Sequence, residues 1–413
     1  MPMGSDDGVR SPKSGKDIVR NFAPAWFAVN MGTGAISLLF YAFPYGNGSQ
    51  GLNVFALIFF FLNLVLFATF VLVQCVRYAM FPDIWWIMLY HPVQSLYLGC
   101  MPMGATTLLN IAVNLINEDY GFGGKAFLYA LWGLWWLDVA ISALCCFGMV
   151  HFMKTRQRHS LEKMTSVWLL PVVTFIVASS SGGVIALPLA KYSSLHALIT
   201  ITTSICLVTI GVSLAFMMLT VYLLRLIVHG LPPGATIVSV FLPLGPMGQA
   251  GYSVLLIGQV LDSILPYGNF GILAVGTTGH VIHVICLCIS MMLWALTTMW
   301  VVYAFLAMHD VLRRNRYPFK LPFWGLIFPN GVYANLTLAL ARALDSRFFR
   351  VYGAIYSIFT LILWIFVSCR TIMLLRGGQI FEAPCLEDVD MTRFNTRPTT
   401  SESKVSTVRV EPS

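Results

Sequence analysis

One carboxyl group lies deep inside an apolar stretch of the sequence. Asp138 belongs to the run Leu-Trp-Trp-Leu-Asp-Val that ends at Val139, and no other residue of that run is charged. An ionisable side chain is costly inside a membrane, so such residues serve a function or pair with a neighbour. Asp138 is therefore a candidate for proton coupling. A structural hydrogen bond to a Ser, Thr or Trp side chain explains it equally well.

The histidines and cysteines offer no comparable site. His280 and His283 share one helix face, but a metal or haem site would need further ligands from another helix. The nine cysteines show no metal-ligand spacing. The sequence also lacks a P-loop, a G-x-S-x-G elbow and a carboxylate pair at a kink. We therefore expect no metal, no cofactor and no catalytic residue, and we do not expect an enzyme.

Phe328 and Pro329 lie in the middle of the apolar segment 323–340. Proline removes a backbone donor and clashes with the preceding turn, so the predicted helix kinks here. In lipid, freed backbone groups are tolerated only against protein or a water-filled cavity. The segment therefore predicts a cavity with the Phe328 ring at its bend. The alternative is a core aromatic packed at a kink.

Glycine, proline and small polar residues recur in every second apolar segment, at 31–34, 99–104, 179–183 and 243–248 and beside Phe328. The segments between them are plain Leu, Phe, Val and Trp helices. This alternation predicts five helical hairpins, each with one kinked helix facing a central pore. The alternative is the general enrichment of Gly and Pro in membrane helices. The predicted pore-lining residues are Gly32, Thr33, Gly34, Pro102, Gly104, Ser179, Gly182, Gly183, Pro243, Gly245, Pro246, Gly248, Pro329 and Asn330.

The composition excludes an ordinary soluble protein. Of the 413 residues, 58% are hydrophobic and 10% are charged, and the mean hydropathy is +0.78. Globular domains are about a quarter charged. We predict an all-α integral membrane protein with ten transmembrane helices, at about 20 residues per crossing. The predicted spans are 22–43, 53–76, 93–116, 127–150, 166–188, 195–228, 239–263, 278–308, 323–341 and 351–375.

Two polar tails flank this membrane domain, which we place at 21–376. Residues 1–20 form an N-terminal tail without the features of a cleavable signal peptide. Residues 377–413 are polar and rich in Ser and Thr, so we expect a disordered tail. Its hydroxyl groups between Thr399 and Thr407 are either phosphorylation sites or part of an inert solvated segment.

Basic residues concentrate on one predicted side of the membrane. The N-terminal tail and the loops after the even-numbered spans hold most of the Lys and Arg residues. The positive-inside rule therefore places both termini in the cytoplasm. The net charge of +8 lies in loops and tails and does not indicate nucleic-acid binding. The opposite loops hold Lys125, Lys191, Arg342, Arg347 and Arg350.

The centres of the predicted inner helices contain no Lys, Arg, Asp or Glu. A pore lined by hydroxyls, amides and bent backbone binds ions weakly, which favours throughput. Basic residues at the cytoplasmic mouth favour an anion as the substrate. A dicarboxylate would require a deep cation for its carboxylates, and none is visible, so a small inorganic anion is favoured.

Three motifs carry a family resemblance. They are Asn-Phe-Ala-Pro-Ala-Trp-Phe-Ala-Val-Asn-Met-Gly-Thr-Gly at 21–34, Leu-Pro-Leu-Gly-Pro-Met-Gly at 242–248 and Ile-Phe-Pro-Asn-Gly at 327–331. With them, about residues 20–376 resemble the tellurite-resistance/dicarboxylate transporter family, which includes slow anion channels and malate permeases. The resemblance is closer to its fungal sulfite-efflux branch.

The resemblance implies five hairpins around a central pore and an assembly of three protomers. It also implies that Phe328 is the gate, because this position matches the phenylalanine that plugs the pore in channel members. The inner-helix glycines and prolines would form the pore. Asn330 and Gly331 differ from the residues that follow the proline in channel relatives, so the surroundings of the gate differ.

The favoured interpretation is a multi-pass plasma-membrane exporter of sulfite or bisulfite, with the lipid bilayer and the small anion as its partners. A malate or dicarboxylate permease and a regulated anion channel are alternatives within the family. A membrane enzyme or sensor that binds a ligand in the cavity is an alternative from another class. The sequence leaves open whether transport is passive or coupled to protons.

Overall fold

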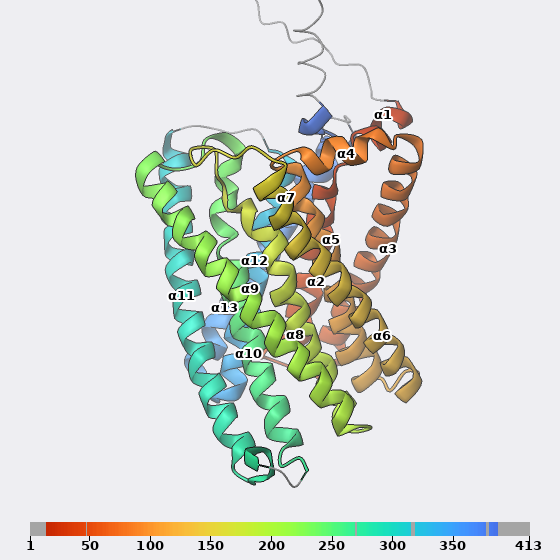
Figure 1. Ribbon diagram of the computed structural model, residues 1–413, viewed down its shortest axis with the longest axis vertical. Coiled ribbons are helices and arrows are strands. Elements are labelled where there is room, and N and C mark those ends of the chain that lie inside the picture. Colours follow the sequence, from red (N-terminus) through yellow and green to blue (C-terminus); the bar gives the residue numbers. More distant parts are fainter. Residues whose placement is uncertain (1–13, 47, 269–270, 315–318, 377–379, 387–413) are drawn as a thin grey trace, which may run out of the picture.

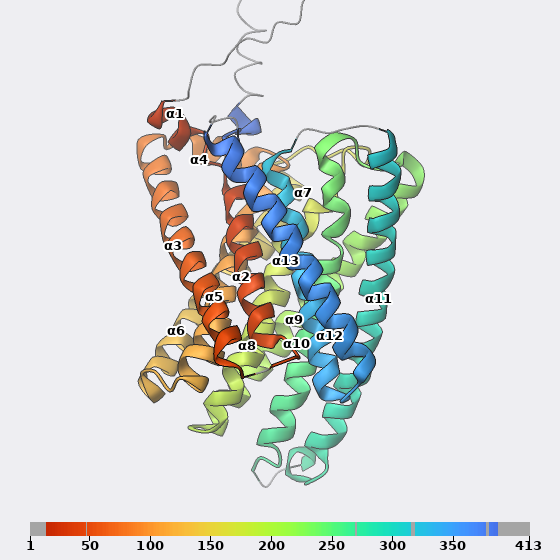
Figure 2. The same cartoon turned by 180° about the vertical axis from the view of Figure 1, so that it is seen from behind.

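The computed structural model describes residues 14–46, 48–268, 271–314, 319–376 and 380–386. These residues form helices without a strand, which confirms the predicted all-α class. Helical hairpins follow one another along the chain (Figures 1 and 2). They are α2 (Phe27–Ala42) with α3 (Gln50–Met80), α5 (Cys100–Ile111) with α6 (Gly124–Ala143), α8 (Leu170–Ala190) with α9 (Ser194–His229), α10 (Leu244–Ile264) with α11 (Thr278–Arg314), and α12 (Ile327–Ala343) with α13 (Arg347–Arg376).

Nine helical segments of the described chain are long and apolar enough to span a membrane. Two of them continue through π-helical turns: η3 (Ala112–Asp119) extends α5, and η4 (Leu144–Gly148) joins α6 to α7 (Met149–Thr155). The predicted span that is missing from these nine is 323–341, which corresponds to α12, a helix of only 17 residues, most of them buried. Helix α12 packs against α2, α10 and α13 inside the bundle.

The five inner helices form a closed ring. Going round it, α2 packs against α5, α5 against α8, α8 against α10, α10 against α12, and α12 against α2. Burial separates these helices from the outer ones. In Ser166–Ala190 the whole of the most apolar window is buried, compared with 17% in Arg347–Arg376. The predicted alternation of inner and outer helices is therefore present in the fold.

Each inner helix is preceded by a 3₁₀ turn. These turns are η1 (Pro24–Trp26), η2 (Gln94–Gly99), η5 (Ser166–Leu169), η6 (Gly234–Phe241) and η8 (Leu321–Leu326). Pro102, Pro171, Pro246 and Pro329 lie in the first turn of the α-helices that follow, where a backbone N–H has no intrahelical acceptor in any case. The kink expected in the middle of 323–340 is therefore a change from 3₁₀-helix to α-helix at Ile327, just before the proline.

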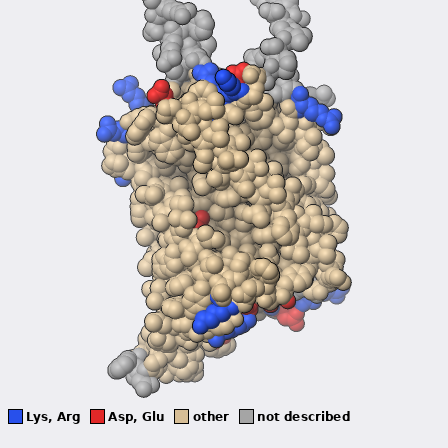
Figure 3. Space-filling view, turned by 90° about the vertical axis from the view of Figure 1, so that its right-hand side faces the viewer, with Lys and Arg blue, Asp and Glu red and all other residues tan. Residues whose placement is uncertain are grey.

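Exposed large hydrophobic side chains cover much of the surface between the two ends of the bundle. On the face shown in Figure 3, Lys and Arg gather only at the ends. One end carries α1 (Gly15–Arg20), α4 (Asp83–Tyr90) and residues 380–386, and we call it the α1 end (Figure 1). At the other end, η7 (Gly271–Ala274) lies between α10 and α11.

The membrane domain does not end at residue 376. Ile380, Phe381, Ala383, Cys385 and Leu386 are buried, so this part of the predicted disordered tail packs against the protein. Buried apolar side chains hold residues 380–386 against the bundle. These few apolar residues do not stand out in the sequence, because the tail as a whole is polar. Residues 1–13 and 387–413, with the predicted phosphorylation sites, lie outside the described residues. All nine cysteines of the chain are free thiols.

Glycines allow the inner helices to approach their neighbours closely. A Cβ atom added to Gly34 would lie 2.0 Å from Thr107 Oγ1. A Cβ atom on Gly182 would lie 2.1 Å from Ser204 Oγ and 2.7 Å from the Trp135 ring. Gly182 therefore sets the spacing of α8 against α6 and α9.

We expect Gly182→Ala to reduce the free energy of unfolding by about 1–3 kcal/mol, because overpacking forces neighbouring groups to shift. Gly133→Ala in α6 is the matched control, since its Cβ would have no atom within 4 Å and alanine favours a helix by about 1 kcal/mol. Thermal unfolding of the detergent-solubilised protein compares the two variants. Equal changes in Tm would contradict the packing role of Gly182.

Candidate functional site

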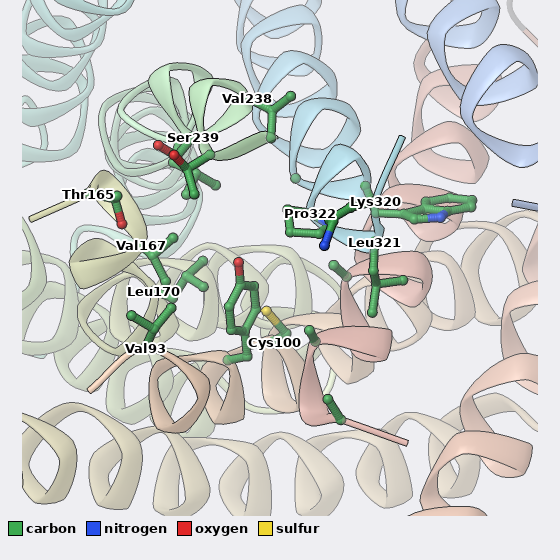
Figure 4. A pocket seen from close by; sticks show the side chains of 18 of the residues that line it. Val93, Cys100, Thr165, Val167, Leu170, Val238, Ser239, Lys320, Leu321 and Pro322 are labelled. Carbon is green, nitrogen blue, oxygen red and sulfur yellow. The ribbon is translucent and has the colours of Figure 1, made fainter. Parts of the chain in front are cut away.

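A cavity of about 750 Å³ opens at the α1 end of the ring. All five 3₁₀ turns contribute to its wall, through Ala25, Gln94, Val167, Val238 and Trp324 among others (Figure 4). First-turn residues of all five inner α-helices line it as well: Ala28, Cys100, Leu170, Gly245 and Phe328. Helix N-termini carry unpaired N–H groups and a partial positive charge, so the backbone around this cavity favours an anion.

The charged side chains in the described wall are mostly basic. They are Lys163, Lys320 and Arg370, with Glu382 as the acidic residue. Lys320 Nζ donates a hydrogen bond to Glu382 Oε2 at 2.8 Å. Figure 4 shows the amine of Lys320 turned into the cavity beside Pro322. Cations in a hollow with apolar walls raise the local concentration of anions.

Phe328 lies between this cavity and a second, much smaller space. Its side chain is 6% exposed, and it lines both the cavity and a chamber of about 20 Å³, which is room for about one water molecule. No other described residue lines both. The chamber takes residues from all five inner helices, namely Ala35, Leu38, Thr106, Thr107, Asn110, Val177, Gln249, Tyr252, Gly331, Val332 and Asn335. An apolar ring between two spaces inside one helix ring has the geometry of a constriction.

Three polar side chains that line the chamber already donate hydrogen bonds within the protein. Thr106 Oγ1 donates to Met103 O at 2.7 Å, and Thr107 Oγ1 donates to Gly104 O at 2.7 Å, so both hydroxyl hydrogens are already used. Asn63 Nδ2 also donates to Thr107 Oγ1 at 3.1 Å. The side chain of Gln249 donates to the Ser180 hydroxyl group. An anion in this chamber would meet no charged side chain among the described lining residues, so it would be bound weakly.

Most of the predicted pore-lining residues lie at helix contacts. Gly245 and Pro329 line the large cavity, whereas Gly32 faces Ile327 and Gly248 faces Val332. Asn330 is directed toward α13. The remaining predicted residues line neither space and are buried between neighbouring helices: Thr33, Gly34, Pro102, Gly104, Ser179, Gly182, Gly183, Pro243 and Pro246.

Asn330 fixes the start of α12 and, with it, the position of Phe328. Its Nδ2 donates to Leu326 O at 2.6 Å, at the junction between η8 and α12. Its Oδ1 accepts a hydrogen bond from Tyr356 Oη of α13 at 2.6 Å. One turn further on, Tyr333 Oη lies 2.7 Å from Thr298 Oγ1 of α11. These contacts join α12 to both neighbouring outer helices.

Asp138 is 4% exposed on α6 and lines neither space. Its Oδ2 has no hydrogen-bond partner among the described residues, although Ser142 lies close to the carboxyl group. His283 Nδ1 lies 3.2 Å from Asp262 Oδ2, on the α10–α11 hairpin. Within the described part of the chain, no group of three or more His, Cys, Asp and Glu residues could hold a metal ion.

The comparison with protein families decides the relationship of this chain. The profile of the family described as "SLAC1: Voltage-dependent anion channel" matches residues 21–372. The chain belongs to the SLAC1 family. The family resemblance read from its motifs is thereby confirmed.

Several SLAC1 relatives are named as transporters. The "Sulfite efflux pump SSU1" of Trichophyton rubrum is 35% identical over 354 residues, which cover 86% of this chain and 91% of that protein. The protein of the same name from Arthroderma otae is 34% identical over the same shares. The "Malic acid transport protein" of Schizosaccharomyces pombe is 22% identical over 356 residues, which cover 84% of this chain and 77% of that protein. These names indicate transporters and channels of the SLAC1 family, not enzymes.

Some residues of this candidate site are not apparent from the sequence. In the sequence, Lys163, Lys320 and Arg370 are loop or tail charges that indicate orientation, and Tyr252 is part of a predicted span. A signal was available for Lys320, because it directly precedes the segment that carries Phe328. The position of Arg370 on the cavity wall depends on how α13 crosses the ring, which no local pattern shows.

We expect Tyr356→Phe to lower the free energy of unfolding by about 1–3 kcal/mol, because Asn330 Oδ1 would remain buried without its donor. Tyr303→Phe is the matched control, since Tyr303 lies exposed on α11. Thermal unfolding of both variants in detergent measures the difference. A Tm for Tyr356→Phe that equals the control would show that Asn330 does not depend on this bond.

Proposed function

We propose that this chain exports sulfite or bisulfite across the plasma membrane. The observation that carries the proposal is the 35% identity to proteins named sulfite efflux pump over 86% of the chain. The cavity supports it, because its wall is basic at the α1 end and the chamber beyond Phe328 holds no charged residue among its described lining. Under this proposal the α1 end faces the cytoplasm, as the positive-inside rule predicts.

The absence of a cation from the described lining of the small chamber favours a small inorganic anion over a dicarboxylate. The relative named for malic acid transport, at 22% identity, keeps malate as the second candidate. Anion flux in proteoliposomes that contain the purified full chain tests the choice, with sulfite, malate, nitrate and chloride compared. Sulfite flux well above malate flux supports the exporter, and dominant malate flux would overturn it.

An assembly of three protomers is part of the proposal and rests on the family resemblance alone. The mass of the detergent-solubilised protein, measured by light scattering with the detergent contribution subtracted, tests it. A mass near three times 45.9 kDa is expected. A monomer mass at the same concentration would contradict this assembly.

We further propose that Phe328 is the gate. We expect Phe328→Ala to raise sulfite flux about tenfold, equivalent to a barrier lowered by about 1.4 kcal/mol, because the ring that separates the cavity from the chamber is removed. Phe323→Ala is the control, since Phe323 packs on Phe319 with ring centroids 4.9 Å apart and does not line the cavity. Unchanged or lower flux in a Phe328→Ala protein that elutes and unfolds normally would argue against the gate.

Asp138 is our proposed proton-coupling residue. Its buried carboxyl group has an unpaired oxygen, although it lines neither of the two spaces. We expect Asp138→Asn to remove the dependence of sulfite flux on an imposed proton gradient, because the asparagine amide does not take up a proton at the pH values of such a measurement. The measurement is flux with and without the gradient. An unaltered gradient dependence would leave Asp138 with a structural role only.

A further inference from the structure

Residues 380–386 form part of the wall of the large cavity at the α1 end. Ile380, Glu382 and Pro384 line the cavity. Phe381 and Cys385, which alternate with them, are buried at 8% and 2% exposure. The backbone turns here, with Glu382 N–H donating to Ile380 O and Leu386 N–H to Ala383 O, so that some side chains line the cavity and others pack into the protein. We call residues 380–386 the strap.

The buried face of the strap is held by named contacts. The ring of Phe381 stacks on Trp26, with centroids 5.3 Å apart. Ala383, Cys385 and Leu386 form a cluster with two buried residues of α4. Burial raises the pKa of the Cys385 thiol, and the neighbouring Arg77 guanidinium opposes that rise.

Arg77 also holds the other end of the chain in place. It is fully buried, and its Nε donates to Arg20 O at 3.0 Å at the end of α1. The strap is therefore part of the packed protein at the α1 end, and the chain before α2 and the chain after α13 meet at one buried guanidinium.

The cavity face of the strap presents a carboxylate to a lysine. Glu382 is the acidic residue among the described residues of the wall, and its Oε2 accepts a hydrogen bond from Lys320 Nζ at 2.8 Å. A carboxylate and a sulfite ion are both oxyanions that accept hydrogen bonds from an ammonium group. Glu382 is therefore already paired with Lys320, the cation that a small oxyanion would meet in this cavity.

We propose that Lys320 is the first binding site for the transported anion, and that Glu382 is a tethered anion that competes for it. This inference rests on the proposed anion transport and adds its first binding site and its regulation. Because Glu382 is attached to the protein, its effective concentration at Lys320 is high and does not depend on the concentration of any solute. The anion must displace Glu382 before it reaches Phe328, so half-maximal flux requires a higher anion concentration on this side.

The exposure of the pair makes displacement feasible. The side chains of Lys320 and Glu382 are 45% and 35% exposed. Ion pairs that remain in contact with water contribute little to stability, since solvent screens them. Glu382 therefore leaves Lys320 at little cost, while the buried contacts of Phe381 and Cys385 keep the strap in place.

The test measures sulfite flux against sulfite concentration in proteoliposomes that contain the full chain. We expect Glu382→Gln to lower the half-saturating concentration roughly two- to five-fold, the range for a partly exposed ion pair, without changing the maximal rate. Asp310→Asn is the matched control. Asp310 is a 61% exposed acidic residue at the end of α11 that lies outside the cavity wall, so the variant should equal the unmodified protein.

A second variant separates competition from simple plugging. Lys320→Gln should raise the half-saturating concentration, and adding Glu382→Gln to it should have no further effect. Glu382→Gln could change sulfite flux equally in the protein that retains Lys320 and in the Lys320→Gln variant, or it could change only the maximal rate. In either case the strap does not compete for Lys320, and the inference is wrong. If the protein does not transport sulfite, the proposed substrate is wrong. The same test is then made with the anion that gives the largest flux in the unmodified protein.

Binding provides a readout that does not depend on flux. Trp324 lies in the cavity wall, so tryptophan fluorescence of the solubilised full chain titrated with sulfite gives an apparent Kd. The same roughly two- to five-fold fall is expected for Glu382→Gln. An unchanged Kd together with unchanged flux would refute the inference while leaving the transport proposal intact.

Discussion

Backbone polar groups inside a membrane need partners, and the starts of the inner helices show how this protein meets that demand. A helix leaves its first N–H groups without intrahelical acceptors. Here the inner helices begin with 3₁₀ turns, and several place a proline in the first α-helical turn, which removes one such donor. The starts of all five inner helices line a cavity of about 750 Å³. The position of this cavity therefore follows from where five helices begin.

The cavity and the chamber inside the helix ring differ in the charge of the residues that line them. Lys163, Lys320 and Arg370 lie in the wall of the cavity, whereas the described lining of the chamber beyond Phe328 is uncharged. The hydroxyl groups of Thr106 and Thr107 in the chamber donate to carbonyl groups of their own helix. Attraction at the wide end and weak binding at the narrow end suit an anion that must leave as readily as it arrives. The buried amides of Asn30 and Asn63 hold α2, α3 and α5 in register beside this path.

The sequence was sufficient for the class of fold, because hydrophobic length and the recurrence of Gly and Pro in every second segment directly reflect membrane thickness and inward position. It was less informative about side-chain direction. Gly34 and Gly182 belong to inner helices as predicted, yet their missing side chains face Thr107 and Ser204 of neighbouring helices. A glycine that permits close packing and one that lines a pore look the same in sequence. The strap was missed for a related reason: its apolar residues are few within a polar tail.

The free thiols of this chain have a chemical consequence if the exported anion is sulfite. Sulfite is a sulfur nucleophile that cleaves disulfide bonds and leaves thiols intact. All nine cysteines of the chain are thiols, and Cys100 lies on the wall of the cavity itself. A protein stabilised by disulfides would lose those bonds to sulfite, which converts each into a thiol and an S-sulfonate. Stability that comes from helix packing alone would make this protein chemically resistant to sulfite.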